Sequence, residues 1–225
     1  AQICEESKCT GCLACMNLCP CGAITCQERE DGNVIPQIDP EKCIECHRCV
    51  QGCPENHVKE KHEPRQCYAA WQKDRKERKY SASGGIAFGF YKRWIQNAGI
   101  VYGAAFNEKG ILTQQKAETL EEIKKFRGSK YAQSHTGFVY SDIGKELKKG
   151  EKVLFIGTPC QIAGLKAYLG KASDALVTID LICHGTPPMS YLEEYIKEIA
   201  GAEKVDRVSF RGEKDYHVVF YSQDR

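Results

Sequence analysis

The most constraining feature of this sequence is one cysteine spacing that occurs twice. Its two copies are Cys9-x2-Cys12-x2-Cys15-x3-Cys19-Pro20 and Cys43-x2-Cys46-x2-Cys49-x3-Cys53-Pro54. Three thiolates spaced in this way can surround one cubane iron–sulfur cluster without regular backbone, and a fourth thiolate before a proline reaches a neighbouring cluster. We therefore predict one 4Fe-4S cluster on Cys9, Cys12, Cys15 and Cys53, and a second on Cys43, Cys46, Cys49 and Cys19.

Zinc and disulfide bonds are the alternatives for so many cysteines. A zinc site usually pairs two short Cys-x-x-Cys knuckles across a longer gap, and a disulfide framework has no repeated four-cysteine run. The doubled run is instead that of bacterial two-cluster ferredoxins. We expect such a chain to move electrons, because two adjacent clusters are a costly way merely to hold a fold together.

The composition favours a reducing cytoplasm. The sequence has 14 cysteines, and in a reducing compartment cysteines are usually ligands or catalytic groups. It shows no apolar stretch long enough to span a bilayer, and no charged start followed by an apolar signal segment. We therefore expect a cytoplasmic protein of an oxygen-poor cell, without a membrane span.

Charge is unevenly distributed along the chain. Residues 1–63 carry six Lys and Arg against eleven Asp and Glu, whereas residues 64–225 carry 26 against 19. This asymmetry favours packing between an acidic and a basic part, or steering of a redox partner, although a solvated mixture of charges explains it equally well. The run from Lys73 to Lys79 alternates in sign, which argues against a nucleic-acid partner.

The character of the sequence changes near Glu63-Pro64, where a proline interrupts regular structure. Before this point, a turn at 31–33 and the apolar strip Val34–Ile38 predict a small hairpin between the two cysteine runs. After it, strand-like and helix-like segments alternate. We predict an α/β protein, α+β overall, with a small bacterial-ferredoxin-like domain over residues 1–63 and a mixed α/β domain over residues 64–225.

The second domain is expected to follow a β/α pattern. Strands are predicted at 100–106, 152–156, 175–182 and 205–210, the second and third of them apolar enough to be buried on both faces. Helices are predicted at 86–98, 117–126, 137–149, 161–169 and 190–200. A further β region is expected at 216–221.

Unusual chemistry follows two of these strands. In open α/β sheets ligands gather beyond the carboxyl ends of the strands, so Cys160 and Cys183 are expected at one edge, with Thr158 beside them. One interpretation makes the two cysteines ligands of a further cluster, or redox-active thiols. A second makes Cys160 a nucleophile at a helix N-terminus with His184 as its base, and a third makes both cysteines small packing residues. His184 is also the expected proton carrier.

Two loops predict a bound nucleotide cofactor. Ser83 is expected to cap the helix that follows it, while Gly84 and Gly85 admit a phosphate to free backbone N–H groups. The second loop, from Arg127 onward, supplies hydroxyls, a cation and a stacking ring in Ser129, Lys130, Tyr131 and Ser134. Ser-Gly-Gly before a helix is by itself more often only a cap and a turn. The Gly-x-Gly-x-x-Gly fingerprint and the phosphate-binding loop of nucleotide hydrolases are absent.

From about Cys67 to Arg211 the chain resembles the beta subunits of coenzyme F420 hydrogenases and dehydrogenases, in the architecture where a ferredoxin segment precedes a flavin domain. The resemblance rests, in family order, on Ser83-Gly84-Gly85, Val101-Tyr102-Gly103-Ala104, Gly128-Ser129-Lys130-Tyr131, Gly157-Thr158-Pro159-Cys160-Gln161 with Gly164-Leu165, and Asp180-Leu181-Ile182-Cys183-His184-Gly185. It implies that the two loops hold FAD and that the segments around Cys160 and Cys183 lie near its ring. It also implies electron exchange with a deazaflavin or another reducible partner.

The resulting hypothesis is an iron–sulfur flavoprotein oxidoreductase. It exchanges electrons between a deazaflavin or other organic substrate, FAD and two 4Fe-4S clusters, with a redox protein or small-molecule donor or acceptor as partner. The alternative is a non-catalytic, ferredoxin-type electron carrier with a docking domain.

Some features of the chain have no place in this hypothesis. Members of the family generally continue beyond Arg225, so we expect the chain to be a fragment with an incomplete flavin domain. Cys4, Cys26 and Cys67 have no assigned role, and Cys21 is expected to pack beside a cluster, with replacement of a ligand as the alternative.

Overall fold

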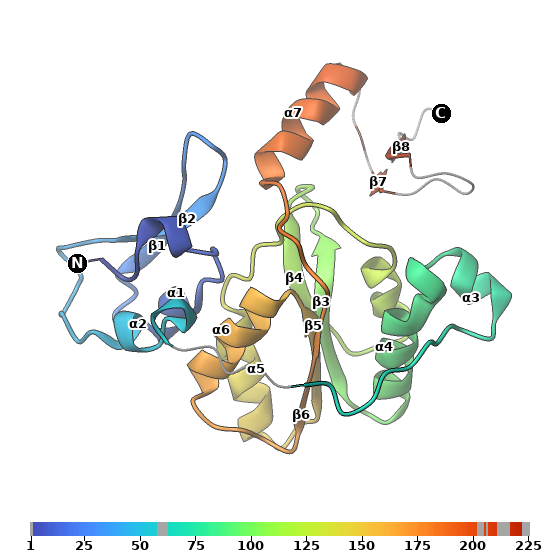
Figure 1. Ribbon diagram of the computed structural model, residues 1–225, viewed down its shortest axis with the longest axis horizontal. Helices are drawn as coiled ribbons and strands as arrows, with labels where there is room; N and C mark the ends of the chain where they lie inside the picture. The colour runs from blue at the N-terminus through green and yellow to red at the C-terminus, as the bar shows by residue number, and fades with distance from the viewer. Residues whose placement is uncertain (1, 58–62, 202–204, 206, 211–216, 222–225) are drawn as a thin grey trace. The chain divides into compact units, whose positions relative to one another are not determined.

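The structure, a computed structural model, describes residues 2–57, 63–201, 205, 207–210 and 217–221 (Figure 1). The chain divides into two compact units, Ala1–Gln66 with His135–Cys183 and Cys67–Ser134 with His184–Arg225. The first unit is therefore discontinuous in sequence. This division into packing units does not decide the domains expected at 1–63 and 64–225, which stay a prediction.

The N-terminal part of the first unit is built from a short hairpin and short helices. Strands β1 (Ile24–Glu28) and β2 (Val34–Ile38) pair antiparallel, with Ile24 opposite Ile38. Helices α1 (Ala14–Leu18) and α2 (Arg48–Gln51) each follow a residue in the left-handed region, and the single-turn helices are η1 (Glu6–Lys8) and η2 (Pro54–Asn56). The hairpin and the brief helices agree with the expected ferredoxin-like segment.

Cysteines form a large part of the core of this segment. The buried side chains are Ile3, Leu13, Cys15, Met16, Ile24 and Cys53, and further cysteines pack around them. Such a small segment buries little aliphatic surface, and small domains of this kind usually need a metal or another covalent support to be stable. The packing therefore agrees with a segment that is organised around metal clusters.

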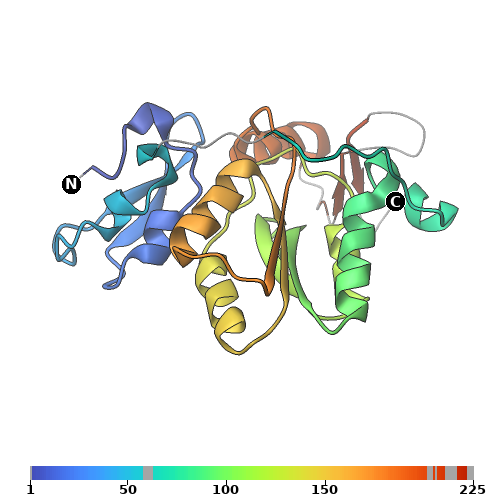
Figure 2. The same ribbon diagram turned by 60° about the horizontal axis from the view of Figure 1, so that its bottom comes forward.

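The remainder of the first unit is a β/α repeat. Its elements are α5 (Val139–Lys148), β5 (Val153–Gly157), α6 (Pro159–Leu169) and β6 (Leu176–Asp180). Strands β5 and β6 pair in parallel with Gly157 opposite Asp180, and α5 packs beside α6 (Figure 2). Strand β5 is buried throughout, as expected, but β6 is not. The prediction that both strands are buried on both faces is thus wrong for β6, where Val177 is 39% exposed despite its apolar side chain.

The second unit contains an antiparallel strand pair with helices. Helix α4 (Ile86–Gln96) precedes β3 (Ile100–Phe106), which pairs with β4 (Leu112–Ala117). The other elements are α3 (Arg75–Lys79), η3 (Ser83–Gly85), η4 (Glu122–Phe126), α7 (Met189–Ala200), β7 (Arg207–Ser209) and β8 (Val219–Tyr221).

The helix expected at 117–126 is wrong. Ala117 ends β4, and only Glu122–Phe126 turn as a short 3-10 helix. The reason is local, because the Glu122 carboxylate accepts hydrogen bonds from the N–H groups of Glu118 and Thr119 at 2.8 and 3.0 Å and so stabilises a turn in their place. The apolar residues of this segment, Ile123 and Phe126, are nevertheless buried.

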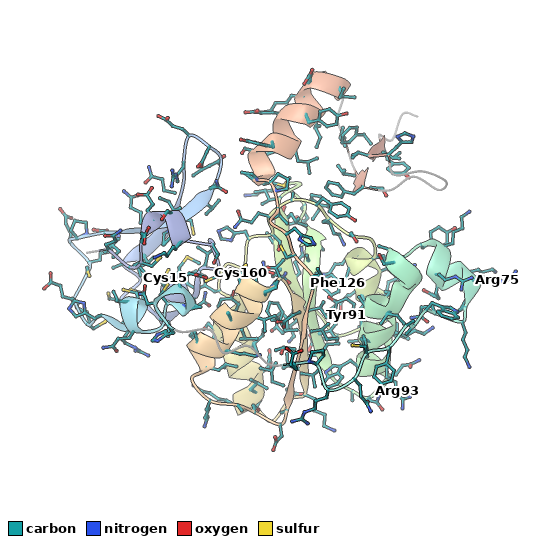
Figure 3. The ribbon with its side chains drawn as sticks, viewed as in Figure 1. Cys15, Arg75, Tyr91, Arg93, Phe126 and Cys160 are labelled. Atoms are coloured by element: carbon teal, nitrogen blue, oxygen red, sulfur yellow. The ribbon has the colours of Figure 1, made fainter. Side chains whose placement is uncertain are left out.

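A glycine permits the closest packing in this unit. A Cβ at Gly103 of β3 would come within 2.3 Å of the Tyr91 hydroxyl and 3.0 Å of the Phe126 ring. Tyr91 and Phe126 themselves stack with centroids 5.1 Å apart, and Figure 3 shows the two rings together. The glycine thus lets α4 and η4 approach the strand.

None of the helices within the described residues combines the length and apolar character needed to cross a membrane.

Candidate functional site

Two cavities in the first unit collect most of the cysteines. The first is lined by the side chains of five of them, Cys4, Cys9, Cys12, Cys15 and Cys53, together with Ile3, Thr10, Leu13 and Glu55. It combines three cysteines of the first run with the last cysteine of the second run. This is the combination that the sequence predicts for one cluster, with Cys4 added.

The second cavity has the complementary set. It is lined by Cys19, Cys21, Cys43, Cys46 and Cys49, with Ile24, Ile38, Ile44 and His47. Cys19 comes from the first run, and Cys43, Cys46 and Cys49 come from the second run, again as the sequence predicts. The ligand roles of these cysteines stay a prediction, but the chain brings the two predicted sets together.

Local backbone conformation explains how short runs enclose a cavity. Leu13 and His47 precede α1 and α2 at φ 60° and 54°, in the left-handed region. Such a residue reverses the chain sharply, so cysteines on both sides of it turn toward one point. Within the described residues no three His, Cys, Asp or Glu side chains converge as they would on a single metal ion.

Burial disfavours the thiolate form of two cysteines in the first cavity. Burial raises the pKa of Cys12 to about 11 and raises that of Cys15 further. In the second cavity, burial also acts to raise the pKa of Cys19, but the backbone N–H groups of Ala23 and Cys21 lower it overall. The N–H of Ala23 lies 3.3 Å from the Cys19 sulfur. Because metal ligands must be thiolates, we expect cluster binding to release protons from the first cavity.

A polar contact joins the first cavity to helix α5 and the residues before it. The backbone carbonyl of Cys12 accepts hydrogen bonds from the Thr136 hydroxyl at 3.0 Å and from the Tyr140 hydroxyl at 2.9 Å. Thr136 is 2% exposed and Tyr140 is fully buried. The loop that carries Cys12 is therefore fixed by residues more than a hundred positions away in sequence. We call these two residues, together with Asn17 of α1, the Cys12 clamp.

Asn17 completes the clamp from the side of α1. Its amide donates to the carbonyl of Gly137 at 2.8 Å and to that of Leu13 at 3.0 Å. Its side-chain oxygen accepts from the N–H of Ser141 at 3.1 Å. One side chain thus joins the start of α1 to the start of α5 by hydrogen bonds.

Cys160 lies at the first turn of α6 near the same cavity. Thr158 begins this helix, and its backbone N–H donates to the side chain of Gln161 at 3.1 Å. The Cys160 sulfur lies 3.1 Å from the Thr158 hydroxyl. Burial raises the pKa of Tyr140 well above its usual value, and a negative charge on nearby Cys12 or Cys160 would raise it further. Figure 3 shows Cys160 at the end of α6 that faces the part carrying Cys15.

The segment after β6 leaves the strands at the same edge as Cys160. The N–H of Leu181 donates to the carbonyl of Gly157 at 2.9 Å, which extends the β5–β6 pairing by one step. Cys183 follows two residues later and is partly buried. The expected common edge is therefore present, whereas a pairing of Cys160 with Cys183, and a role of His184 as base, stay predictions.

The Ser-Gly-Gly loop does not have the expected form. Ser83 is not the cap of α4, because Gly85 occupies that position and Ser83 lies inside η3 with φ 47°. A Cβ at Gly84 would come within 3.2 Å of Trp71, and one at Gly85 within 3.0 Å of Gln72. The expectation that Ser83 caps the helix is therefore wrong. The glycines give room to the chain's own segment at 71–72, as well as satisfying positive φ angles.

The second loop keeps more of its expected polar character. The Lys130 ammonium donates to the carbonyls of Lys125 at 3.1 Å and Arg127 at 2.9 Å, and burial lowers its pKa to about 7. The Tyr131 ring is 49% exposed and meets Phe210 edge to face at 5.8 Å. Ser134 accepts a hydrogen bond from Gln114 at 3.4 Å, and Ser129 is partly exposed.

Sequence reasoning missed several residues of this site. Cys4 lines the first cavity although it lies outside both runs, and the Cys12 clamp comes from residues with no motif of their own. Cys21 lines the second cavity and its sulfur lies 3.6 Å from that of Cys19, which agrees with the expectation that it packs beside a cluster. The clamp depends on long-range contacts, for which a single sequence gives no signal.

Two segments of the chain match described families. Residues 150–225 match the family described as the C terminus of the coenzyme F420 hydrogenase/dehydrogenase beta subunit. Residues 8–57 match the 4Fe-4S dicluster domain. The resemblance drawn from the sequence motifs is confirmed, and the chain is an iron–sulfur protein related to electron-transferring oxidoreductases.

Individual proteins are similar to parts of the chain. The F subunit of the F(420)H(2) dehydrogenase of Methanosarcina mazei is 25% identical over 199 residues, which cover 81% of this chain and 55% of that protein. The B subunit of the Na(+)-translocating ferredoxin:NAD(+) oxidoreductase complex of Acetobacterium woodii is 44% identical over 48 residues, 21% of this chain and 13% of that protein. A structure of the F420-reducing NiFe hydrogenase complex from Methanosarcina barkeri has a TM-score of 0.48 at 19% identity, covering 68% of this chain and 59% of that chain. The chain thus spans about half the length of the first of these relatives.

Proposed function

We propose that this chain is an iron–sulfur flavoprotein oxidoreductase that passes electrons between a deazaflavin or another organic substrate, FAD and two 4Fe-4S clusters. The observation that carries the proposal is the sorting of the two cysteine runs into two cavities, each with three cysteines of one run and the last cysteine of the other. The match of residues 8–57 to a dicluster domain supports it independently.

The donor set of both cavities fits 4Fe-4S clusters. Cys9, Cys12, Cys15 and Cys53 would hold the first cluster, and Cys43, Cys46, Cys49 and Cys19 the second. When bound, such clusters take up and release single electrons, and a flavin exchanges electron pairs with an organic substrate. Around the first cavity, the buried side chains of Ile3 and Leu13 would shield the cluster from water.

Residues of the first unit have definable tasks in this function. Thr136 and Tyr140 hold the carbonyl of Cys12 and thereby the loop around the first cluster. Helix α6, which carries Cys160 in its first turn, packs against α1, so the residues of this turn would flank the first cluster. The backbone N–H groups of Ala23 and Cys21 lower the pKa of Cys19 and would stabilise it as a thiolate ligand of the second cluster.

FAD fits one of its two proposed loops better than the other. At the second loop, Gly128 has open space where a side chain would be, the Tyr131 ring is half exposed, and Lys130 and Ser129 supply polar groups. At the first loop, residues 71–72 of the chain lie beside Gly84 and Gly85, and a phosphate contact of Ser83, Gly84 and Gly85 stays a proposal from the family. Binding of FAD by Ser129, Lys130, Tyr131 and Ser134, with Thr158, Cys183 and His184 near its ring, is a proposal from the family.

The experiment that tests this function is anaerobic spectroscopy of the purified chain with acid extraction of any flavin. We expect about eight iron atoms per chain and a broad cluster absorption. Bound flavin, together with reduction of the clusters by reduced deazaflavin, supports the oxidoreductase. Clusters without flavin, also after the chain is extended beyond Arg225, would replace the proposal by a non-catalytic carrier. A chain that takes up zinc and no iron would overturn both.

A further inference from the structure

We propose that Cys4 is a reserve ligand of the first iron–sulfur cluster, able to take over the iron held by Cys53 or Cys9. This inference rests on the proposed function, since it requires a cluster in the first cavity. Cys4 lies outside both cysteine runs and outside residues 8–57 that match the dicluster domain. It is therefore a fifth thiol in a cavity whose cluster needs four.

The first argument is the position of the Cys4 thiol. Cys4 lines the same cavity as the four proposed ligands. Its thiol is a hydrogen-bonding neighbour of the thiols of Cys53 and Cys9. Cys4 thus lies beside one particular edge of the proposed cluster site, between a ligand from each run.

The second argument is that the backbone fixes Cys4 from both sides. Helix η1 folds the chain back between Cys4 and Cys9, with the N–H of Lys8 donating to Glu5 at 3.0 Å and that of Cys9 donating to Glu6 at 3.2 Å. On the other side, Asn56 follows Cys53 by three residues, and its amide donates to the carbonyl of Ile3 at 2.8 Å. The same amide donates to the carbonyl of Val50 at 2.9 Å.

A comparison with Cys26 separates this arrangement from ordinary packing. Cys26 belongs to the same small core, but its sulfur contacts the sulfur of Met16 at 3.8 Å and it does not line the first cavity. Cys26 therefore behaves as a small apolar side chain, as free cysteines commonly do. Cys4 differs because its neighbours are thiols that would be coordinated to iron.

The exchange needs no oxidant or reductant. An Fe–S bond to Cys53 or Cys9 is replaced by one to Cys4, and the thiol proton of Cys4 passes to solvent while the leaving thiolate is protonated. The number of electrons in the cluster does not change. In Cys53→Ala, residue 53 has no thiolate to offer, and Cys4 would bind the iron that Cys53 would otherwise hold.

The test compares the loss of different ligands of one cluster. We expect Cys53→Ala to retain about eight iron atoms per chain, because Cys4 binds the fourth iron, whereas Cys12→Ala loses iron and shows the EPR signal of a 3Fe-4S cluster. Cys12 is the matched control, because the contacts of Cys4 are with Cys53 and Cys9. Cys4→Ala/Cys53→Ala is expected to resemble Cys12→Ala, and Cys26→Ala to resemble the wild type.

A second measurement covers the case in which Cys53→Ala does not fold. Cys9→Ala removes the other neighbour and is expected to keep the fourth iron in the same way. In the wild-type holoprotein, mass spectrometry after anaerobic alkylation is expected to find Cys4 modified, and in Cys9→Ala or Cys53→Ala to find it protected. Iron loss in both variants equal to that in Cys12→Ala, with Cys4 alkylated in all of them, would overturn the inference. A wild type without any cluster would instead overturn the proposed function.

Discussion

The Cys12 clamp offers a quantitative test of how the first cavity is held in place. Tyr140→Phe and Thr136→Val each remove one hydrogen bond to the Cys12 carbonyl while keeping nearly the same shape. A neutral hydrogen bond contributes about 1 kcal/mol net to stability, so each single variant is expected to lower the free energy of unfolding by about that amount. Each one leaves the carbonyl with the other donor.

The double variant is expected to lower the free energy of unfolding by more than the sum of the two single variants. Without Thr136 and Tyr140 the carbonyl of Cys12 has lost both side-chain donors in a largely buried place. A buried acceptor without a partner costs about 1–3 kcal/mol, so we expect about 3 kcal/mol or more in total and a coupling of about 1 kcal/mol. The first cluster is also expected to be released at lower denaturant concentration, because its loop is no longer fixed.

The assay is anaerobic urea unfolding of the cluster-loaded chain, followed in parallel by backbone circular dichroism and by cluster absorption. Stability differences are taken from midpoints when the slope m is unchanged. A matched control is Tyr168→Phe, which alters a tyrosine on α6 outside the clamp. Additivity of the two clamp variants within about 0.5 kcal/mol would refute the idea that they share one carbonyl as acceptor.

Three further predictions follow from other parts of the structure. Gly164→Ala is expected to destabilise the chain by about 1 kcal/mol or more, because the Tyr140 hydroxyl would lie only 2.8 Å from the new Cβ, and this overpacking outweighs the better helix propensity of alanine. Gly144→Ala is the control, since its Cβ would meet Tyr168 at 3.2 Å, and equal unfolding midpoints for the two variants would contradict this reasoning. The free energy of unfolding is expected to rise between about pH 7 and about pH 10, because Lys130 has a pKa of about 7 in the folded chain and an ordinary pKa in the unfolded chain, which therefore binds more protons in this window. Lys130→Met is expected to remove this rise, and urea midpoints that shift equally between pH 6 and pH 9 in the variant and the wild type would speak against the prediction. Removal of iron by a chelator is expected to abolish amide hydrogen-exchange protection in β1 and β2, because the core of residues 2–57 is rich in the proposed ligands, while β3 and β4 keep their protection. Protection that survives in the β1–β2 hairpin would show that its core is stable without metal.

Much of the fold could be predicted from local pattern. The strands at 100–106 and 153–157 and the helices that begin at Val139 and Pro159 agree with the sequence expectation to within a few residues, because apolar periodicity and terminal glycines mark them. The prediction of a helix at 117–126 is wrong because the Glu122 carboxylate caps the backbone in a turn. The burial of β6 was misjudged because an apolar sequence does not reveal which of its faces is covered.

The candidate site was predictable where the spacing of residues encodes the geometry. The cysteine runs predict which side chains share a cavity, because three cysteines within seven residues have few ways to enclose one centre. Cys4 and Tyr140 reach the same place through tertiary packing, which no local pattern reports. Ser83 illustrates the opposite error, since Ser-Gly-Gly before α4 suits a cap at Ser83, yet Gly85 takes that position, and positive φ angles and the proximity of Trp71 and Gln72 explain the two glycines.

The discontinuity of the first unit has a consequence for synthesis on the ribosome. The contacts of Cys12 with Thr136 and Tyr140 join residues 124 and 128 positions apart. The first cysteine run therefore leaves the exit tunnel well before the residues that fasten Cys12 have been made, and during this interval its thiols lack the surroundings of the folded unit. At about 5–20 residues per second the interval lasts on the order of ten seconds. Cluster delivery to this chain is thus either an early event on a loosely held segment or waits until α5 and α6 have been made.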